Sequence, residues 1–165
     1  MSKRARNSAC QEVLDYCQLM EAAALYVKQK APKVDSPEAV ATVMRPLLQN
    51  LDQESLWVIT LNVKHHVIGI HEVTKGLADR SQAHPREIFR HAIRDNASRI
   101  ILVHNHPSGD PTPSTQDTQA THQLTKAGAI VGIDLLDHIV MAAPIEGQSD
   151  HVSMRECGLL KEASK

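Results

Sequence analysis

Two histidines two positions apart, followed across one loop by a serine and an aspartate, are the residues of this chain best suited to chemistry. His104 and His106 close an apolar run, and Ser114 and Asp117 follow a proline-rich loop. Residues two apart in an extended backbone share a face, so both imidazoles can be presented to one point. Two imidazoles and one carboxylate make a three-ligand set for zinc with one position open. The spacing therefore predicts a Zn²⁺ site with His104, His106 and Asp117 as ligands.

An open coordination position is typical of catalytic rather than structural zinc. Zinc can lower the pKa of a bound water to about 7, which supplies hydroxide at neutral pH for attack on a carbonyl. Each feature also has a structural explanation, because Ser114 and Asp117 form the Ser-x-x-acid pattern of a helix cap, worth roughly 1 kcal/mol without any metal. The conjunction of paired histidines, a stiff loop and a carboxylate at a helix start favours the metal site.

The same residues resemble the JAMM signature of JAB/MPN-domain metallopeptidases, in which seven residues separate His-x-His from a serine and two more precede an aspartate. The string HNHPSGDPTPS is similar to the RadC branch of that superfamily, and the likeness extends more loosely over about residues 36–160. The resemblance implies that His104, His106 and Asp117 bind zinc and that Ser114 helps to stabilise an oxyanion. It also implies that an upstream glutamate works on the metal-bound water.

Two glutamates are candidates for that upstream residue. Glu54 stands immediately before the apolar run at residues 55–61, as the family's glutamate introduces an apolar strand, whereas Glu72 sits well along the next predicted strand. We choose Glu54. Its predicted task is to take a proton from the zinc-bound water and pass it to the leaving amine, which requires hydrogen-bond reach. The alternative is a solvated glutamate at a strand start.

Alternating helix and strand signals predict an α/β fold for the residues that must position this site. The apolar, β-branched runs predict strands at 55–61, 67–74, 100–103, 130–133 and 135–141, the first two paired antiparallel through a turn at 62–65. Together with the resemblance, they predict a single JAB/MPN-like (cytidine deaminase-like) domain, a mixed sheet flanked by helices on both faces.

Three helices are predicted around that sheet. The first begins at Ser36, is expected to be kinked or shortened by Pro46, and has a core face of Val40, Val43, Leu47 and Leu51. The second spans 84–96 and has a core stripe of Ile88, Phe89, Ala92 and Ile93. The third runs from Ser114 to a C-cap near Gly128.

The first part of the sequence is predicted to form a helix separate from the domain. Residues 1–35 are expected to contain an amphipathic helix, at about 8–30, and a short linker, and residues 36–165 the RadC-like JAB/MPN domain. The helix could be a partner-binding arm, but packing on the domain or on a second copy is favoured. A homo-oligomer is therefore one expectation.

Several other polar residues invite a role. His65, His66 and His71 surround the predicted hairpin but match no ligand pattern. The pair at 137–138, Asp137 and His138, resembles the family pattern and could orient a ligating histidine, or could be a structural pair. Arg86 could hold a substrate carboxylate, but a surface or supporting ion pair is favoured.

Composition sets further limits. The formal net charge of −1 gives no electrostatic case for nucleic acid, and nucleic-acid binding stays undecided. Three cysteines, Cys10, Cys17 and Cys157, include no Cys-x-x-Cys pair, so a disulfide framework is not expected and a reducing, cytoplasmic setting is. No apolar run approaches the roughly 18 residues of a membrane span, and the basic start lacks the apolar stretch of a signal peptide.

The sequence thus predicts a zinc-dependent hydrolase of amide bonds, of metallopeptidase or isopeptidase type, with a peptide or an isopeptide-linked protein as substrate. The alternative is a metal-stabilised binding module without turnover, linked to DNA repair or mobile elements. A zinc nucleobase deaminase would need a Pro-Cys-x-x-Cys ligand pair, which the sequence lacks. The letters His-Asn-His also name a nuclease class, but its residues are dispersed over a ββα unit rather than adjacent.

Overall fold

A mixed sheet forms the centre of the domain in the computed structural model, which describes residues 31–48, 52–76, 84–143, 147 and 149–160. The helix predicted at about 8–30 lies outside the described residues. The sheet order is β2-β1-β3-β4-β5, with β1 (Ser55–Leu61), β2 (Val67–Lys75), β3 (Arg99–His106), β4 (Asp134–Ala142) and β5 (His151–Ser153). Only β3 and β4 run parallel; the other neighbouring pairs are antiparallel, which confirms the predicted mixed sheet.

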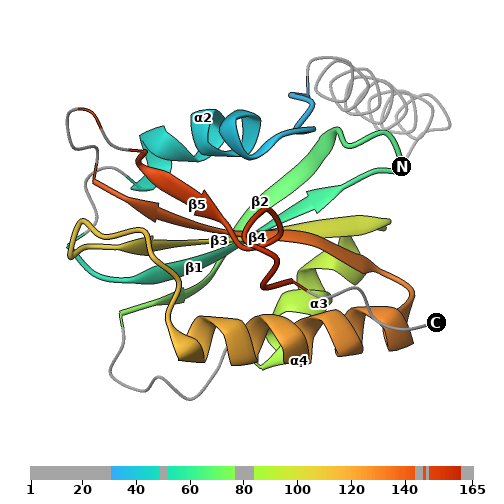
Figure 1. Ribbon diagram of the computed structural model, residues 1–165. Helices are drawn as coiled ribbons and strands as arrows, with labels where there is room; N and C mark the ends of the chain where they lie inside the picture. The colour runs from blue at the N-terminus through green and yellow to red at the C-terminus, as the bar shows by residue number, and fades with distance from the viewer. Residues whose placement is uncertain (1–30, 49–51, 77–83, 144–146, 148, 161–165) are drawn as a thin grey trace, which may run out of the picture. The chain divides into compact units, whose positions relative to one another are not determined.

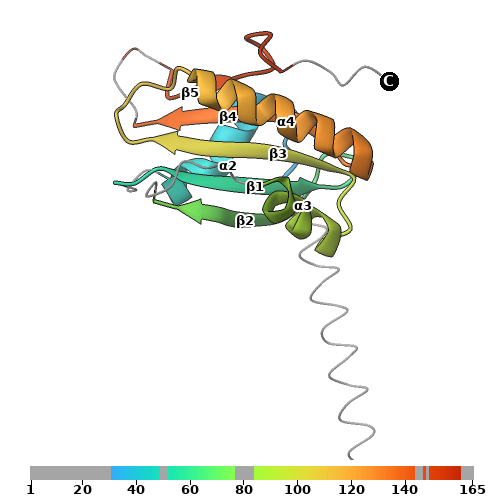
Figure 2. The same cartoon turned by 90° about the horizontal axis from the view of Figure 1, so that it is seen from below.

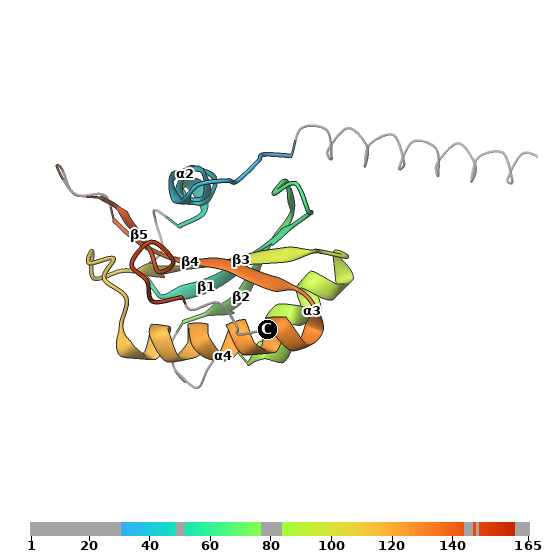
Figure 3. The same cartoon turned by 45° about the vertical axis from the view of Figure 1, so that its right-hand side comes forward.

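Helices cover both faces of this sheet, as predicted. Helix α2 (Pro37–Leu48) lies on one face, and α3 (Pro85–Arg94) and α4 (Thr115–Val131) lie on the other (Figure 1 and, from another side, Figure 3). Figure 2 shows the sheet from the α3 and α4 side. Alternate residues of β1 and β3 enter opposite layers, so Ile59 and Ile101 pack toward α2 while Val58 and Leu102 pack toward α3 and α4.

The strand predictions are confirmed in the half of the sheet that carries the site. β1 has the predicted bounds, and β2 returns antiparallel beside it. β3 continues through both histidines instead of ending before His104, because β4 extends alongside it and pairs His104 with Val140 and His106 with Ala142. The histidines therefore belong to a hydrogen-bonded strand rather than to a loop.

The predicted end of the third helix is wrong. Helix α4 continues past Gly128 to Val131, and Gly132 is the C-cap with a φ of 77°, so no strand forms at residues 130–133. The amides of Gly132 and Ile133 both donate to the carbonyl of Gly128. Gly128 is buried within the helix because the chain returns so closely that an added Cβ would meet the Ile133 carbonyl oxygen at 2.5 Å.

Two predicted core faces also need correction. In α2 the buried side chains are Val40, Ala41, Met44 and Leu48, while Leu47 is 42 % exposed and Pro46 lies inside the helix without ending it before Leu48. In α3, Ile93 is 61 % exposed, since the helix rests on the sheet through Ile88, Phe89 and Ala92. Among the described residues, no helix has the length and hydropathy needed to cross a bilayer.

Candidate metal centre

The two histidines at the end of β3 point their rings at one another. The Nε2 atoms of His104 and His106 are 2.9 Å apart. Asp117, in the first turn of α4, places Oδ1 3.5 Å from His104 Nε2 and Oδ2 3.7 Å from His106 Nε2. One ligand atom from each residue lies within 4.8 Å of the others. The structure thus brings the three predicted ligands together.

Ring orientation at the second histidine is fixed by the loop that follows it. His106 Nδ1 lies 2.8 Å from the carbonyl oxygen of Asp110. A carbonyl only accepts hydrogen bonds, so Nδ1 carries a proton, and in the neutral ring Nε2 presents a lone pair. The proline-rich loop after His106 therefore supplies the carbonyl that favours the His106 tautomer with a free Nε2.

Protonation states in the cluster suit a cation. Burial lowers the pKa of His104 to about 4, so the ring is neutral at physiological pH. Burial works against charge on Asp117, but the neighbouring His104 and the hydrogen bonds from Ser114 outweigh it and hold the pKa of this carboxyl below its ordinary value. A neutral imidazole, as at His104, and an ionised carboxylate are forms that bind metal.

Ser114 is the N-cap of α4 and lies against Asp117. Its Oγ accepts from the Asp117 amide at 3.1 Å and donates to Asp117 Oδ2 at 2.6 Å, and its own amide donates to the same oxygen at 2.7 Å. The capping pattern foreseen in the sequence is therefore real. A hydroxyl has a single hydrogen, and here that hydrogen is bonded to the carboxylate.

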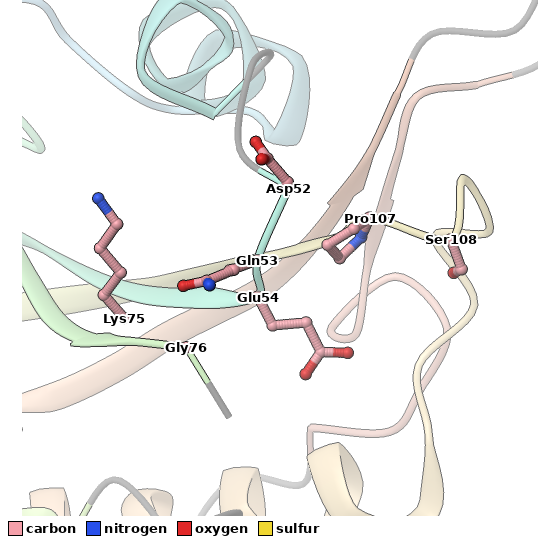
Figure 4. Close-up of a pocket in the computed structure, with 7 residues that line it drawn as sticks. All are labelled: Asp52, Gln53, Glu54, Lys75, Gly76, Pro107 and Ser108. Atoms are coloured by element: carbon pink, nitrogen blue, oxygen red, sulfur yellow. The ribbon is translucent and has the colours of Figure 1, made fainter. Parts of the chain in front are cut away.

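Glu54 precedes β1 on the side of the sheet that carries the histidines. Leu56 is opposite His104 in the antiparallel β1 and β3 pair, and residues opposite one another, or two apart, share a face. Extending this register by two residues sets Glu54 level with His106. Figure 4 shows the side chains of Asp52 and Glu54, both in the segment before β1, pointing in opposite directions.

A cavity of about 640 Å³ opens beside this glutamate (Figure 4). Its lining combines three consecutive residues before β1, the end of β2 and the start of the loop after His106: Asp52, Gln53, Glu54, Lys75, Gly76, Pro107 and Ser108. The cavity therefore extends from Glu54 to the residue that directly follows His106, while none of the three candidate ligands lines it.

Glu72, the competing candidate, lies on the other face. It is exposed and pairs with Trp57, which packs against the α2 layer. Its neighbour His71 faces α3 instead, where it bonds Asp95 and stacks on His91. The structure therefore separates Glu72 from the two candidate ligand histidines by the thickness of the sheet.

Asn105 between the histidines was not singled out as a functional residue. Its side chain is buried; Oδ1 accepts from the amide and hydroxyl of Ser55 at 2.8 and 2.9 Å, and Nδ2 donates to the carbonyl of Gln53 at 3.0 Å. These bonds reach both neighbours of Glu54. The available signal was an asparagine on the strand face that Ile101 and Val103 fill with apolar side chains, because a buried amide needs partners.

The remaining predicted residues fall into two groups. His138 is buried against His104, whereas Asp137 turns away and accepts bonds from the Ser153 hydroxyl and the Arg155 amide. Only His138 of that pair therefore contacts a candidate ligand, His104. Arg86 forms an exposed ion pair with the adjacent glutamate, in line with the favoured surface interpretation.

Comparison with known proteins agrees with this geometry. A family profile described as the RadC-like JAB domain matches residues 34–159. The chain is 42 % identical over 129 residues to a UPF0758 protein of Desulfitobacterium hafniense, covering 78 % of this chain and 55 % of that one. It is 44 % identical over 128 residues to a UPF0758 protein of Clostridium beijerinckii, with shares of 78 % and 54 %, and 46 % identical over 125 residues to one of Symbiobacterium thermophilum, with shares of 76 % and 51 %.

The chain spans about half the length of these relatives, whose name states no activity. The family match covers most of the chain and includes every predicted metal ligand. The chain belongs to the RadC-like JAB domain family.

Proposed function

We propose that this domain is a zinc-dependent hydrolase of amide bonds that acts on a peptide or an isopeptide-linked protein. The observation that carries the proposal is the convergence of His104, His106 and Asp117, with two ring nitrogens 2.9 Å apart beside a carboxylate. Two nitrogen lone pairs so close to a negative charge repel unless a cation or a proton lies between them. The donor set, two imidazoles and one carboxylate, fits Zn²⁺ with a position left open.

These three side chains would hold the ion. When bound, zinc supplies a positive charge that polarises a carbonyl and lowers the pKa of a nearby water. The protein residues then provide the proton transfers and the orientation of the substrate.

Glu54 is the proposed general base. Two features support this role: the β1 and β3 register, extended to Glu54, assigns it to the face of the two histidines, and the cavity next to it offers room for the chain of a substrate. The carboxylate accepts a proton from the attacking water and returns it to the departing amine nitrogen. Asn105 supports this role because it fastens the residues on either side of Glu54 to β3.

Ser114 is the proposed donor to the oxyanion. Its hydroxyl hydrogen is bonded to Asp117, so it must rotate away from the carboxylate before it can donate to a substrate oxygen. The Ser114 amide bond to Asp117 can persist during that rotation and keep the carboxylate in place.

Metal content tests the foundation of the proposal. Purified wild type is expected to retain about one zinc per chain by mass spectrometry, and His106→Ala to lose it, because removing one of three ligands leaves too few donors. His84→Ala, which changes an exposed histidine at the start of α3, is the matched control and should keep the metal. Negligible zinc in the wild type, even after incubation with the ion, would refute the proposal.

Hydrolysis of a panel of peptide and isopeptide substrates tests the chemistry. Glu54→Gln should keep zinc and lower turnover by about 10²- to 10⁴-fold, since it removes the general base. Glu72→Gln makes the same change on the opposite face and should leave turnover unaltered. A zinc-loaded protein that cleaves nothing, and whose biological effect survives Glu54→Gln, would instead be a metal-stabilised binding module.

A further inference from the structure

A buried chain of hydrogen bonds runs from the first ligand histidine to the start of α4. His104 Nδ1 lies 2.8 Å from His138 Nε2, and His138 Nδ1 lies 2.6 Å from Thr121 Oγ1. The Thr121 hydroxyl in turn donates to the backbone carbonyl of Asp117 at 2.6 Å. His104, His138 and Thr121 are all buried, so water does not compete for these bonds.

The donor and acceptor of every hydrogen bond in this chain follow from the group at its end, the Asp117 carbonyl. The Asp117 carbonyl can only accept, so it takes the single hydrogen of Thr121; the other contact of that hydroxyl, Met154 Sδ at 3.4 Å, is a much poorer acceptor. Thr121 Oγ1 must then accept from His138 Nδ1. A neutral His138 has one proton, so its Nε2 accepts, and His104 Nδ1 is the donor.

The result is that His104 keeps a lone pair on Nε2, the atom that faces His106 and Asp117. In the other tautomer a proton would stand on Nε2, between the converging ligand atoms. Asp117 therefore contributes twice, with its carboxylate as a proposed ligand and with its backbone carbonyl as the end of the chain that sets the ring of another ligand.

We propose that Thr121 and His138 are positioning residues that hold His104 in the tautomer able to bind metal through Nε2. This inference rests on the proposed zinc centre. Groups that orient ligating histidines typically change metal affinity by 10- to 100-fold when removed. The two residues come from α4 and β4, so packing of the helix on the sheet is coupled to the state of the ligand.

A structural role alone would also explain buried polar groups, because each must find a partner. Thr125 provides the comparison. It is buried one turn further along α4, and its hydroxyl bonds the Thr121 carbonyl without touching either histidine. Thr121→Val and Thr125→Val delete the same atom from the same helix, and only the first breaks the chain to His104. Thr121→Ser restores the hydroxyl.

The test measures Zn²⁺ affinity by competition with a chromogenic chelator, and histidine tautomers in the metal-free protein from imidazole ¹⁵N shifts. We expect Thr121→Val to bind zinc about 10- to 100-fold more weakly and to lose the exclusive Nδ1 protonation of His104, while Thr121→Ser and Thr125→Val keep both properties. The wild-type spectrum alone should show His104 and His138 protonated on Nδ1, so the test does not depend on a variant that folds.

Each outcome is informative. A metal-free wild type with His104 protonated on Nε2, or a Thr121→Val protein with unchanged tautomers and zinc affinity, overturns the inference while the zinc centre stands. A wild type that binds no zinc overturns the proposed function instead, and the ¹⁵N shifts still decide whether the chain sets the tautomer of His104.

Discussion

Replacing Asn105 with alanine should destabilise the domain by more than the loss of one hydrogen bond would. The side chain makes two buried hydrogen bonds, from the backbone amide and the hydroxyl of Ser55, and a partly buried one to the carbonyl of Gln53. A buried hydrogen bond contributes about 1 kcal/mol net, and a buried backbone group left without a partner costs about 1–3 kcal/mol. Summed over these contacts, Asn105→Ala should lower the unfolding free energy by about 3 kcal/mol.

Urea denaturation followed by circular dichroism measures this loss, with unchanged m-values showing that the folded state is comparable. Ser55→Ala removes only the hydroxyl partner of Asn105 and of the Trp57 indole, and should cost about 1 kcal/mol. The double variant should lose less than the sum of the two, because the bond between them is counted in both. Gln119→Ala, an exposed position of α4, is the control for substitution itself.

The same variant separates stability from metal binding. Asn105 points away from the face that carries His104 and His106, so zinc affinity should change much less than it does when a ligand is removed. An Asn105→Ala protein with an unfolding free energy within about 0.5 kcal/mol of wild type would show that the amide does not fasten the segment bearing Glu54.

Two further substitutions test the packing. Gly128→Ala should destabilise the domain by about 1–3 kcal/mol in thermal melts, because the new Cβ meets the Ile133 carbonyl oxygen at 2.5 Å and the Phe89 ring at 3.3 Å. An unhindered helix glycine usually gains about 1 kcal/mol of stability when replaced by alanine, and such a gain here would contradict the close contact. Asp150, bound by the Arg45 guanidinium at 2.6 Å, has its pKa lowered from 3.8 to about 2. The ionised Asp150 therefore stabilises the folded state above pH 3.8, and this stabilisation is lost as the pH falls through about 2. Asp150→Asn should lower the unfolding free energy by about 1–2 kcal/mol at pH 7, a value reduced for solvent screening because Arg45 is 36 % exposed. The difference from wild type should vanish in acid, and a difference independent of pH would refute the pairing.

Local patterns were enough to place the proposed ligands. The alternation of a strand puts His104 and His106 on one face, and the capping pattern puts Asp117 in the first helical turn; both rules act over a few residues and need no knowledge of the rest of the fold. The bounds of β1 were predictable for the same reason, since an almost continuously apolar run is typical of a buried strand.

Features that depend on distant contacts could not be predicted in this way. Gly128 and Gly132 are both reasonable C-caps, and the choice depends on how closely Ile133 returns to the helix. Thr121 looks like any polar helix residue until β4 places His138 beside it. The partners of Asn105 become visible only once β1 is aligned with β3.

The choice between Glu54 and Glu72 shows how far strand alternation can be used. Lys75 of β2 is opposite Ser55, on the α2 side of the sheet. Strict alternation back from Lys75 would assign Val73 to the same side, yet Val73 packs against the α3 and α4 layer. A register shift between the pairs of Leu56 and Trp57 reverses the alternation, so Glu72 falls opposite Trp57 instead of Val58.

No such shift interrupts β1 and β3 between Leu56 and Leu61, and the bonds from Asn105 to Ser55 and Gln53 continue the alignment beyond the last paired residues. Alternation therefore holds for Glu54, where it fails for Glu72. A one-residue slip of β1 against β3 would exchange the faces of all these side chains and carry Glu54 away from the histidines. The register between these two strands is thus a condition for the proposed chemistry, and the buried Asn105 side chain between the two candidate ligands helps to set it.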